Sequence, residues 1–361
     1  RTTQASLLDL PEPTAMLSLT PDYSLPVLKG LKLDPARPLE LEFVVSSGDG
    51  GDVSREEAAS LVRYFLAGLT IPEKDLWVNL SPYENDRIAP EHLGVTDMGK
   101  DLLEQDYLLK QLAGSLTHPD SETGREYWNL KSEISDHEFN KVWIVPETAQ
   151  VYEHGTSGYL INASLKALTE RDYVAMQNNS PSSLVQASAA SGRSSSMSAI
   201  LPEITREINE GKNFAALRQV YHSLALAIWF KKKFARSFYR YYFDASNVQG
   251  ITVEDPGAAQ KIFELYVEAF NKGVYAQDVK VRDPYSQRLI KQRYVAGGFG
   301  ARDFSDSTLR AFTGGDKTVV PRSFAGSSIT MPVKVLLPAI DAERAGSAIN
   351  PLDGQDVDMR A

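Results

Sequence analysis

The spacing of apolar positions predicts a helix directly after Ser54. Ser54 and Glu57 stand three positions apart, as the two partners of a capping box do. The apolar residues that follow fall on one helix face: Leu61, Val62, Phe65 and Leu66. We therefore expect a helix that begins at the capping box and buries this face.

A second helix is predicted from Thr96 or Asp97, either of which can serve as its N-cap, to Gly114, where glycine favours an end. Its leucines recur at helical spacing and should face the core. Asp106 and Lys110 stand four positions apart on this helix. We expect them to form an ordinary ion pair on its solvated surface.

Alternating and β-branched stretches predict strands. The first is "PLELEFVVSS", and two more, "KVWIVPETAQVYE" and "YLINASL", flank residues 154–158. That "HGTSG" segment has the glycine content of a hairpin loop. Ser157 also has the glycine neighbours of a nucleophilic serine, but a nucleophile elbow requires a helix after the serine, and the sequence here is strand-like. We interpret Ser157 as a turn residue.

The second half of the sequence is dominated by helical periodicity. A short helix has Pro202 near its start and Gly211 at its end. Asn213 is then expected to cap a helix of about thirty residues that reaches Tyr242 and spans roughly 45 Å. Another helix is predicted over residues 256–273. The late strand "SSITMPVKVLLP" contains a proline that suits a sheet edge.

These elements predict an α+β fold, with a mixed N-terminal α/β domain that contains a β-hairpin, followed by an α-rich domain with a long helix and a late edge strand. The serine-rich segment "NNSPSSLVQASAASGRSSSMS" has the composition of a flexible linker. The predicted organisation is an extended N-terminal arm (1–29), an acidic α+β domain (30–177), a Ser-rich linker (178–198), a basic α-rich domain (199–345) and a C-terminal tail (346–361).

Composition excludes several kinds of site. The 361 residues include no cysteine, which excludes disulfides, thiolate catalysis and cysteine metal sites. The five histidines show no i,i+4 pair, so we predict no metal site, and no motif predicts a cofactor or a catalytic residue. No apolar run has the length of a transmembrane helix. The sequence starts at Arg1 without an apolar leader, and we expect any signal peptide to have been removed.

Charge is divided unevenly along the chain. Residues 1–177 carry 15 basic and 29 acidic side chains, whereas residues 178–361 carry 23 basic and 18 acidic ones, within a net charge of −9. Residues 211–243 contain no acidic residue and interleave aromatic with basic side chains. Such a face can contact phosphate backbones or an anionic surface. We instead expect it to be solvated or to face a protein partner, because its aromatic residues fall largely on the core side and the overall charge is negative.

Three strings carry a family resemblance: "GLTIPEKDLWVNLSPYENDRI", "FNKVWIVPETAQVYE" and "EINEGKNFAALRQVYHSLALAIWFKKKF". They resemble an uncharacterised family of predicted bacterial proteins, and the likeness spans roughly residues 30–300. The resemblance implies a bacterial source. It implies no activity, cofactor or site residue.

The sequence favours a non-enzymatic, self-assembling structural protein (a shell, sheath, filament or surface-layer subunit) whose copies associate head to tail, with an extracellular or cell-surface location. The alternative is a hydrolase that acts on peptide or glycan through a non-local active site. Nucleic acid is not an expected partner. The predicted interaction residues lie on the arm, the basic helix and the late strand: Leu7, Leu8, Leu10, Lys231, Lys232, Lys233, Arg236, Arg240, Ile329, Val333, Val335 and Leu337.

Overall fold

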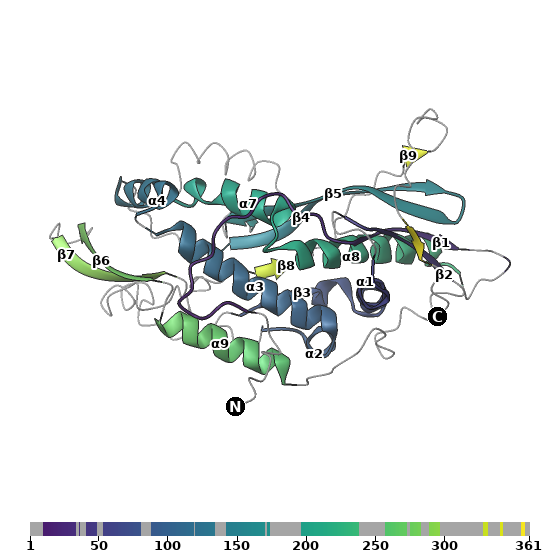
Figure 1. Ribbon diagram of the computed structural model, residues 1–361, viewed down its shortest axis with the longest axis horizontal. Coiled ribbons are helices and arrows are strands. Elements are labelled where there is room, and N and C mark those ends of the chain that lie inside the picture. Colours follow the sequence, from purple (N-terminus) through teal and green to yellow (C-terminus); the bar gives the residue numbers. More distant parts are fainter. Residues whose placement is uncertain are drawn as a thin grey trace.

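The structure of the chain is a computed structural model. It describes residues 10–33, 36, 41–48, 53–80, 88–118, 120–133, 142–169, 172–173, 196–237, 257–272, 275–282, 289–296, 328–330, 340–341 and 355–357. The described residues form an α+β fold, as the sequence predicts, in which a largely antiparallel sheet packs against helices (Figure 1).

Four antiparallel strands make up the centre of the sheet, in the order β2-β1-β5-β4. They are β1 (Val27–Leu33), β2 (Leu41–Ser46), β4 (Val142–His154) and β5 (Ser157–Thr169). Short strands extend the sheet: β10 (Gln355–Val357) beside β2, β8 (Ser328–Thr330) and then β3 (Trp77–Asn79) beyond β4, and β9 (Ile340–Asp341), which also pairs with β4. A separate hairpin joins β6 (Tyr275–Arg282) to β7 (Leu289–Ala296).

Helix α8 (Ala215–Phe234) lies against β1 and β5 on one side and against α1 (Arg55–Thr70) and α3 (Asp97–Leu116) on the other. Helix α7 (Leu201–Glu210) packs on β5, and α9 (Ala258–Lys272) packs on α3. The remaining helical segments are η1 (Glu73–Asp75), α2 (Glu91–Gly94), α4 (Glu122–Glu133) and η3 (Ser196–Ala199).

Local capping chemistry sets the starts of α1 and α3. The Ser54 hydroxyl accepts from the Glu57 N–H at 3.2 Å, and the Glu57 carboxylate accepts from the Ser54 N–H at 2.9 Å, so the predicted capping box is confirmed. Thr96 caps α3 by accepting from the Gly99 N–H. The predicted end at Gly114 is wrong, because α3 continues to Leu116. The last turn is buried on all sides, and this packing outweighs the low helix propensity of glycine.

The hairpin over residues 154–158 is confirmed and is tighter than expected. Strands β4 and β5 pair from Val142 to His154, and His154 lies directly opposite Ser157, so only Gly155 and Thr156 turn the chain. Gly155 adopts φ 60°, a left-handed conformation that glycine tolerates without strain. Ser157 is therefore a strand residue at the end of a two-residue turn.

Three substitutions at two positions test this hairpin. Gly155→Ala should lower the free energy of unfolding by about 1 kcal/mol, because a Cβ disfavours left-handed backbone, while Gly155→Asn should cost less. Ser157→Ala should stay within about 0.5 kcal/mol of the parent. Thermal unfolding followed by circular dichroism measures all three. Equal stability of Gly155→Ala and Ser157→Ala would contradict the turn.

The long helix of the second half is shorter than predicted. Helix α8 ends at Phe234, after 20 residues, and residues 235–237 turn. The Ser237 N–H and hydroxyl both donate to the Phe234 carbonyl, at 2.9 and 2.7 Å, which stabilises a turn in place of the next helical bond. Asn213 is not the N-cap. Phe214 occupies that position without a side-chain bond, while the Asn213 amide donates to the Glu207 carboxylate.

Two predictions about strands are corrected as well. The arm was expected to extend to residue 29, but β1 begins at Val27 and lies in the centre of the sheet. The late strand was expected at an edge. Its described part, β8, pairs with β4 on one side and with β3 on the other, so Ile329 lies in an interior strand. Val333, Val335 and Leu337 lie outside the described residues.

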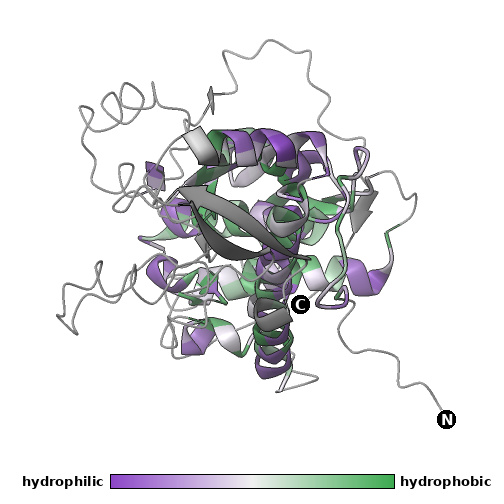
Figure 2. Cartoon of the chain, turned by 90° about the vertical axis from the view of Figure 1, so that its left-hand side faces the viewer, coloured by the Kyte–Doolittle hydropathy of each residue, from purple (hydrophilic) through white to green (hydrophobic). Residues whose placement is uncertain are grey.

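Both halves of the sequence contribute to one hydrophobic core. Its buried residues include Leu31 and Phe65 from the first half and Leu224, Phe230 and Tyr266 from the second. Figure 2 shows hydrophobic ribbon gathered toward the middle of the molecule and hydrophilic ribbon on the outer helices. Most of the predicted linker, residues 178–195, lies outside the described residues, so the linker and the domain boundaries stay predictions.

Helix α7 closes the edge of β5 that β1 leaves open. Strand β1 pairs with β5 only at Gly158 and Tyr159. Farther along, the Asn209 amide donates to the Leu165 carbonyl at 2.7 Å and accepts from the Leu165 N–H at 2.9 Å, as a strand partner would. The Thr205 hydroxyl accepts from the Ala167 N–H. These bonds fix α7, which carries part of the site described next, against the sheet.

Candidate functional site

Residues 10–26 form an extended segment, the strap, that crosses the helices and leads into β1 (dark purple in Figure 1). It contains four prolines, which resist helix formation and remove backbone donors. One turn within it is closed by the Ala15 N–H, which donates to the Glu12 carbonyl, and Asp22 forms an isolated bridge with Gly211. The position of the strap is set mainly by the surface beneath it.

Helix α3 binds the first part of the strap through three polar residues at four-residue intervals, which share one helix face. The Tyr107 hydroxyl donates to the Pro11 carbonyl at 2.9 Å, and the Gln111 amide donates to the Glu12 carbonyl at 3.0 Å. The third residue, Ser115, accepts from the Leu17 N–H at 2.8 Å. All three bonds are made to the strap backbone.

A buried carboxylate on α7 binds the middle of the strap. Glu207 is fully buried and accepts from the Thr20 N–H at 2.8 Å and from the Thr20 hydroxyl at 2.6 Å. The Asn213 amide donates to the same carboxylate at 2.8 Å and to the Ser18 carbonyl at 3.0 Å. The Lys212 N–H in turn donates to the Thr20 hydroxyl. Thr20 is thus the strap side chain that polar groups of the groove recognise directly.

Helix α8 binds the last part of the strap. The Arg218 guanidinium donates to the Tyr23 carbonyl at 2.7 Å and to the Gly211 carbonyl at 2.7 Å, and the Gln219 amide donates to the Pro26 carbonyl at 2.7 Å. Burial lowers the pKa of Arg218, and the nearby Glu207 and Glu210 oppose this shift. A guanidinium placed between carbonyls and two carboxylates keeps its charge and holds the strap end by charge-assisted bonds.

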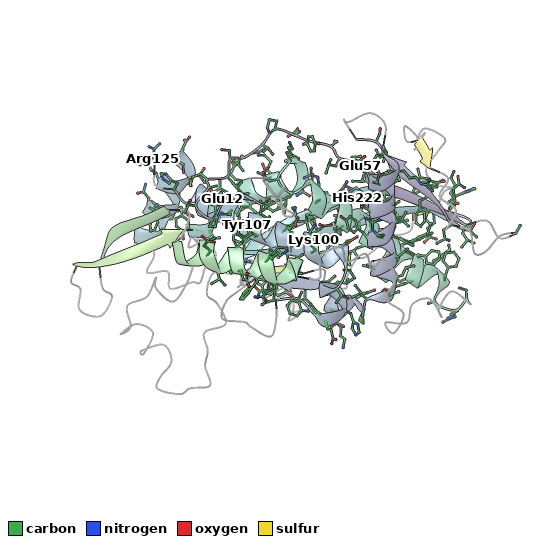
Figure 3. The ribbon with its side chains drawn as sticks, turned by 60° about the horizontal axis from the view of Figure 1, so that its bottom comes forward. Glu12, Glu57, Lys100, Tyr107, Arg125 and His222 are labelled. Atoms are coloured by element: carbon green, nitrogen blue, oxygen red, sulfur yellow. The ribbon has the colours of Figure 1, made fainter. Side chains whose placement is uncertain are left out.

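Apolar contacts accompany these polar ones. Leu10, Leu17 and Leu19 are partly buried and pack against the shared core. Burial raises the pKa of the Tyr107 phenol to about 12. The hydrogen bond from Gln111 opposes this shift, and the charges of Glu12 and Glu268 add to it. The phenol therefore stays protonated near neutral pH and keeps its bond to the strap; Figure 3 shows Glu12 beside it.

The surface under the strap is consequently a groove for extended polypeptide. We call it the strap groove and define it by these residues of α3, α7, α8 and the connection between the last two: Tyr107, Gln111, Ser115, Glu207, Lys212, Asn213, Arg218 and Gln219. Seven of its eight residues bond a backbone N–H or carbonyl of the strap. Such contacts require an extended chain and place few demands on its side chains.

The predicted arm residues are placed only in part. Leu10 packs against the core of its own chain, whereas Leu7 and Leu8 lie outside the described residues. Leu10, which the sequence predicts as an interaction residue, is therefore partly buried within its own chain, and its contact with another copy stays a prediction.

The predicted basic face divides between internal and exposed positions. Lys231 Nζ donates to the carbonyl of Ile71, the C-cap of α1, where a cation is favourable. Lys233 Nζ lies 2.6 Å from the Glu153 carboxylate on β4, an ion pair between the two halves of one chain. Lys232 and Arg236 are exposed, and Arg240 lies outside the described residues. Some of the opposite charges on the two halves therefore pair with each other within a single chain.

Other polar and charged side chains in the described part of the chain form bonds that connect one helix to another. The Tyr64 hydroxyl on α1 donates to the Asp101 carboxylate on α3 at 2.5 Å, and Arg63 pairs with Asp97 beside it. Burial raises the pKa of Asp101, and the bond from Tyr64 opposes the shift. A search of the described residues finds no group of three His, Cys, Asp or Glu suited to a metal ion, and no helix among them could span a membrane.

His222 on α8 is a partly buried titratable group whose protonation affects stability. Its Nδ1 has no hydrogen-bond partner among the described residues. Burial lowers its pKa to about 3, and the positive charges of Lys29 and Arg218 contribute to this shift. The folded chain therefore keeps this imidazole neutral at a pH at which an unfolded chain protonates it.

Acid should accordingly destabilise the fold through His222. The stabilisation is complete above the unfolded pKa near 6.5 and is lost as pH falls from there toward 3, by about 1.4 kcal/mol per pH unit at most. Urea unfolding at pH 7, 5 and 4 should show a shallower acid slope for His222→Asn than for the parent. The control is His92→Asn, at an exposed position on α2. Parallel slopes for His222→Asn and the parent would contradict this prediction.

Sequence reasoning missed the strap groove, although part of its signal is visible. In "YLLKQLAGS", Tyr107, Gln111 and Ser115 recur every four positions among residues that are apolar except for Lys110. Such a stripe indicates a polar ligand for a buried helix face. It does not indicate that the ligand is the backbone of residues 10–26.

Comparisons with known proteins identify no relative. No family model matches the chain, and neither curated proteins nor solved structures match it. The role of the strap groove is therefore inferred from the residues that line it.

Proposed function

We propose that this chain is a self-assembling structural protein, a subunit of a shell, sheath, filament or surface layer whose copies associate head to tail. The observation that carries the proposal is the strap groove. A segment from the N-terminal end of the chain is bound largely through its backbone, first by α3 and then by α7, α8 and their connection in the other half of the chain. An interface between an N-terminal segment and a C-terminal surface is the kind of contact that head-to-tail assembly requires.

The uneven charge supports the same proposal. Opposite net charges on the two halves orient approaching copies, so that the acidic half of one meets the basic half of the next. Charge alone gives a weak contact that salt screens, whereas burial of strap leucines adds apolar area that salt does not screen.

Sedimentation velocity of the full-length chain tests the proposal. The sedimentation coefficient should rise with protein concentration, and part of the rise should persist at high salt. Electron microscopy of the same material should show rings or filaments. A chain that sediments as a monomer at every concentration and at both low and high salt would contradict the proposed function.

A further inference from the structure

We infer that copies of this chain associate by exchanging straps, so that the strap of one copy occupies the strap groove of the next. This inference rests on the proposed function and specifies the contact between copies. Its partner is a second copy of the same chain, and its ligand is the segment 10–23, which precedes the connection to β1.

The first argument is that the groove has no means of distinguishing its own strap from another. The bonds to Pro11, Glu12, Leu17, Ser18 and Tyr23 are all made to backbone atoms. The same segment of a second copy can make every one of them. The free-energy difference between the two arrangements therefore depends on the connection to β1 and on protein concentration, which makes exchange a low-cost route to association.

The second argument concerns the connection itself. The last strap contacts are at Tyr23 and Pro26, and β1 begins at Val27 in the centre of the sheet. Leu25 precedes a proline, which restricts it to extended conformations. The hinge between the last groove contact of the segment and β1 is therefore short, and short hinges favour the exchange of a segment between copies. Fourteen extended residues reach roughly 45 Å, enough to span a neighbouring copy.

The third argument is that the groove recognises side chains that the strap of every copy provides. Glu207 and Lys212 both bond the Thr20 hydroxyl, at 2.6 Å in each case, while Leu17 and Leu19 pack on the core. A segment that fits the groove therefore has the sequence Leu-x-Leu-Thr, which residues 17–20 of this chain provide. Each copy offers one such segment and one groove, so exchange that passes from copy to copy produces the unlike, head-to-tail contact that generates rings or filaments, whereas reciprocal exchange between two copies closes a dimer.

The absence of cysteine makes this inference directly testable in the full chain. Tyr23→Cys marks the strap and Lys212→Cys marks the groove, because the Lys212 ammonium lies 5.7 Å from the Tyr23 ring centre. Both positions contribute to the polar bonds described above through backbone atoms, so both substitutions retain those bonds. The two single-cysteine chains are co-expressed, one with a size tag, and treated with a short bismaleimide. Exchange predicts a covalent product that contains one tagged and one untagged chain.

Two controls sharpen this test. Replacing the groove mark with Lys232→Cys, at an exposed position on α8 away from the strap contacts, should lower the yield of the mixed product to background. An excess of a synthetic peptide of residues 10–26 should compete with the strap and lower the yield. A Thr20→Val peptide should compete about tenfold less well, because it leaves the buried carboxylate without one donor. Circular dichroism verifies that each variant is folded.

The outcomes separate the inference from the proposed function. A mixed product that the peptide suppresses supports strap exchange. Assembly without a mixed product, together with cross-linking inside single chains of the Tyr23→Cys/Lys212→Cys double variant, overturns strap exchange and leaves the proposed function intact. A chain that stays monomeric at every concentration overturns both.

Discussion

Replacing Lys110 by methionine is expected to lower the free energy of unfolding by about 3–5 kcal/mol, because it leaves a buried carboxylate without its cation. Asp106 and Lys110 are almost completely buried, with side chains 0% and 3% exposed, and form an ion pair on α3. Asp106 also accepts from the Leu80 N–H at 2.9 Å, just after β3. Lys110 Nζ lies 5.0 Å from the ring centre of Tyr266 on α9. The pair therefore joins three elements.

A matched double variant distinguishes an unpaired charge from lost packing. Asp106→Asn/Lys110→Met keeps an oxygen that can accept from the Leu80 N–H and removes both charges. It should recover most of the stability that Lys110→Met loses. Unfolding in guanidinium chloride measures both variants. A loss below about 1 kcal/mol for Lys110→Met would show that the pair does not stabilise the interior in this way.

The second large effect is expected at Glu207. Glu207→Ala removes the acceptor of the Thr20 N–H, the Thr20 hydroxyl and the Asn213 amide in a buried site, and each donor left unpaired costs about 1–3 kcal/mol. We expect the strap to detach locally while the sheet stays folded. The free energy required to open the strap should fall by about 3 kcal/mol. Hydrogen exchange of strap amides, followed by mass spectrometry, measures this opening.

Glu203→Ala is the control for Glu207→Ala. It lies one turn earlier on α7, and its 39% exposed side chain pairs with Arg206 at 3.6 Å. An exposed pair of this kind contributes about 0–1 kcal/mol, so strap protection should hardly change. Equal protection of the strap amides in both variants would contradict the role assigned to Glu207.

Features that depend on neighbouring residues were predictable from sequence. The capping box at Ser54, the cap at Thr96 and the hairpin at Gly155 involve partners within three residues of one another. Their chemistry is local, so the sequence contains nearly all of it. The helix ends at Gly114 and beyond Phe234 were predicted less well, because packing and a serine turn overrode propensity there.

The strap groove and the burial of the ion pair could not be predicted from residues that are neighbours in the sequence. Glu207 bonds a residue 187 positions away, and Arg218 bonds one 195 positions away. Asp106 and Lys110 have the spacing of a surface pair, and only the packing of β3 and α9 over them makes the pair buried. Spacing reveals which residues share a face, but tertiary contacts decide whether water reaches that face.

The mass distribution of the native full-length chain tests head-to-tail association most directly. An unlike interface leaves one strap and one groove unused at the ends of every open assembly, so head-to-tail growth continues past two copies, whereas two copies that exchange straps reciprocally close as a dimer. Native mass spectrometry at increasing protein concentration should show trimers and larger species, or a closed ring of more than two copies. A distribution that contains only monomers, or that stops at dimers, would contradict head-to-tail assembly.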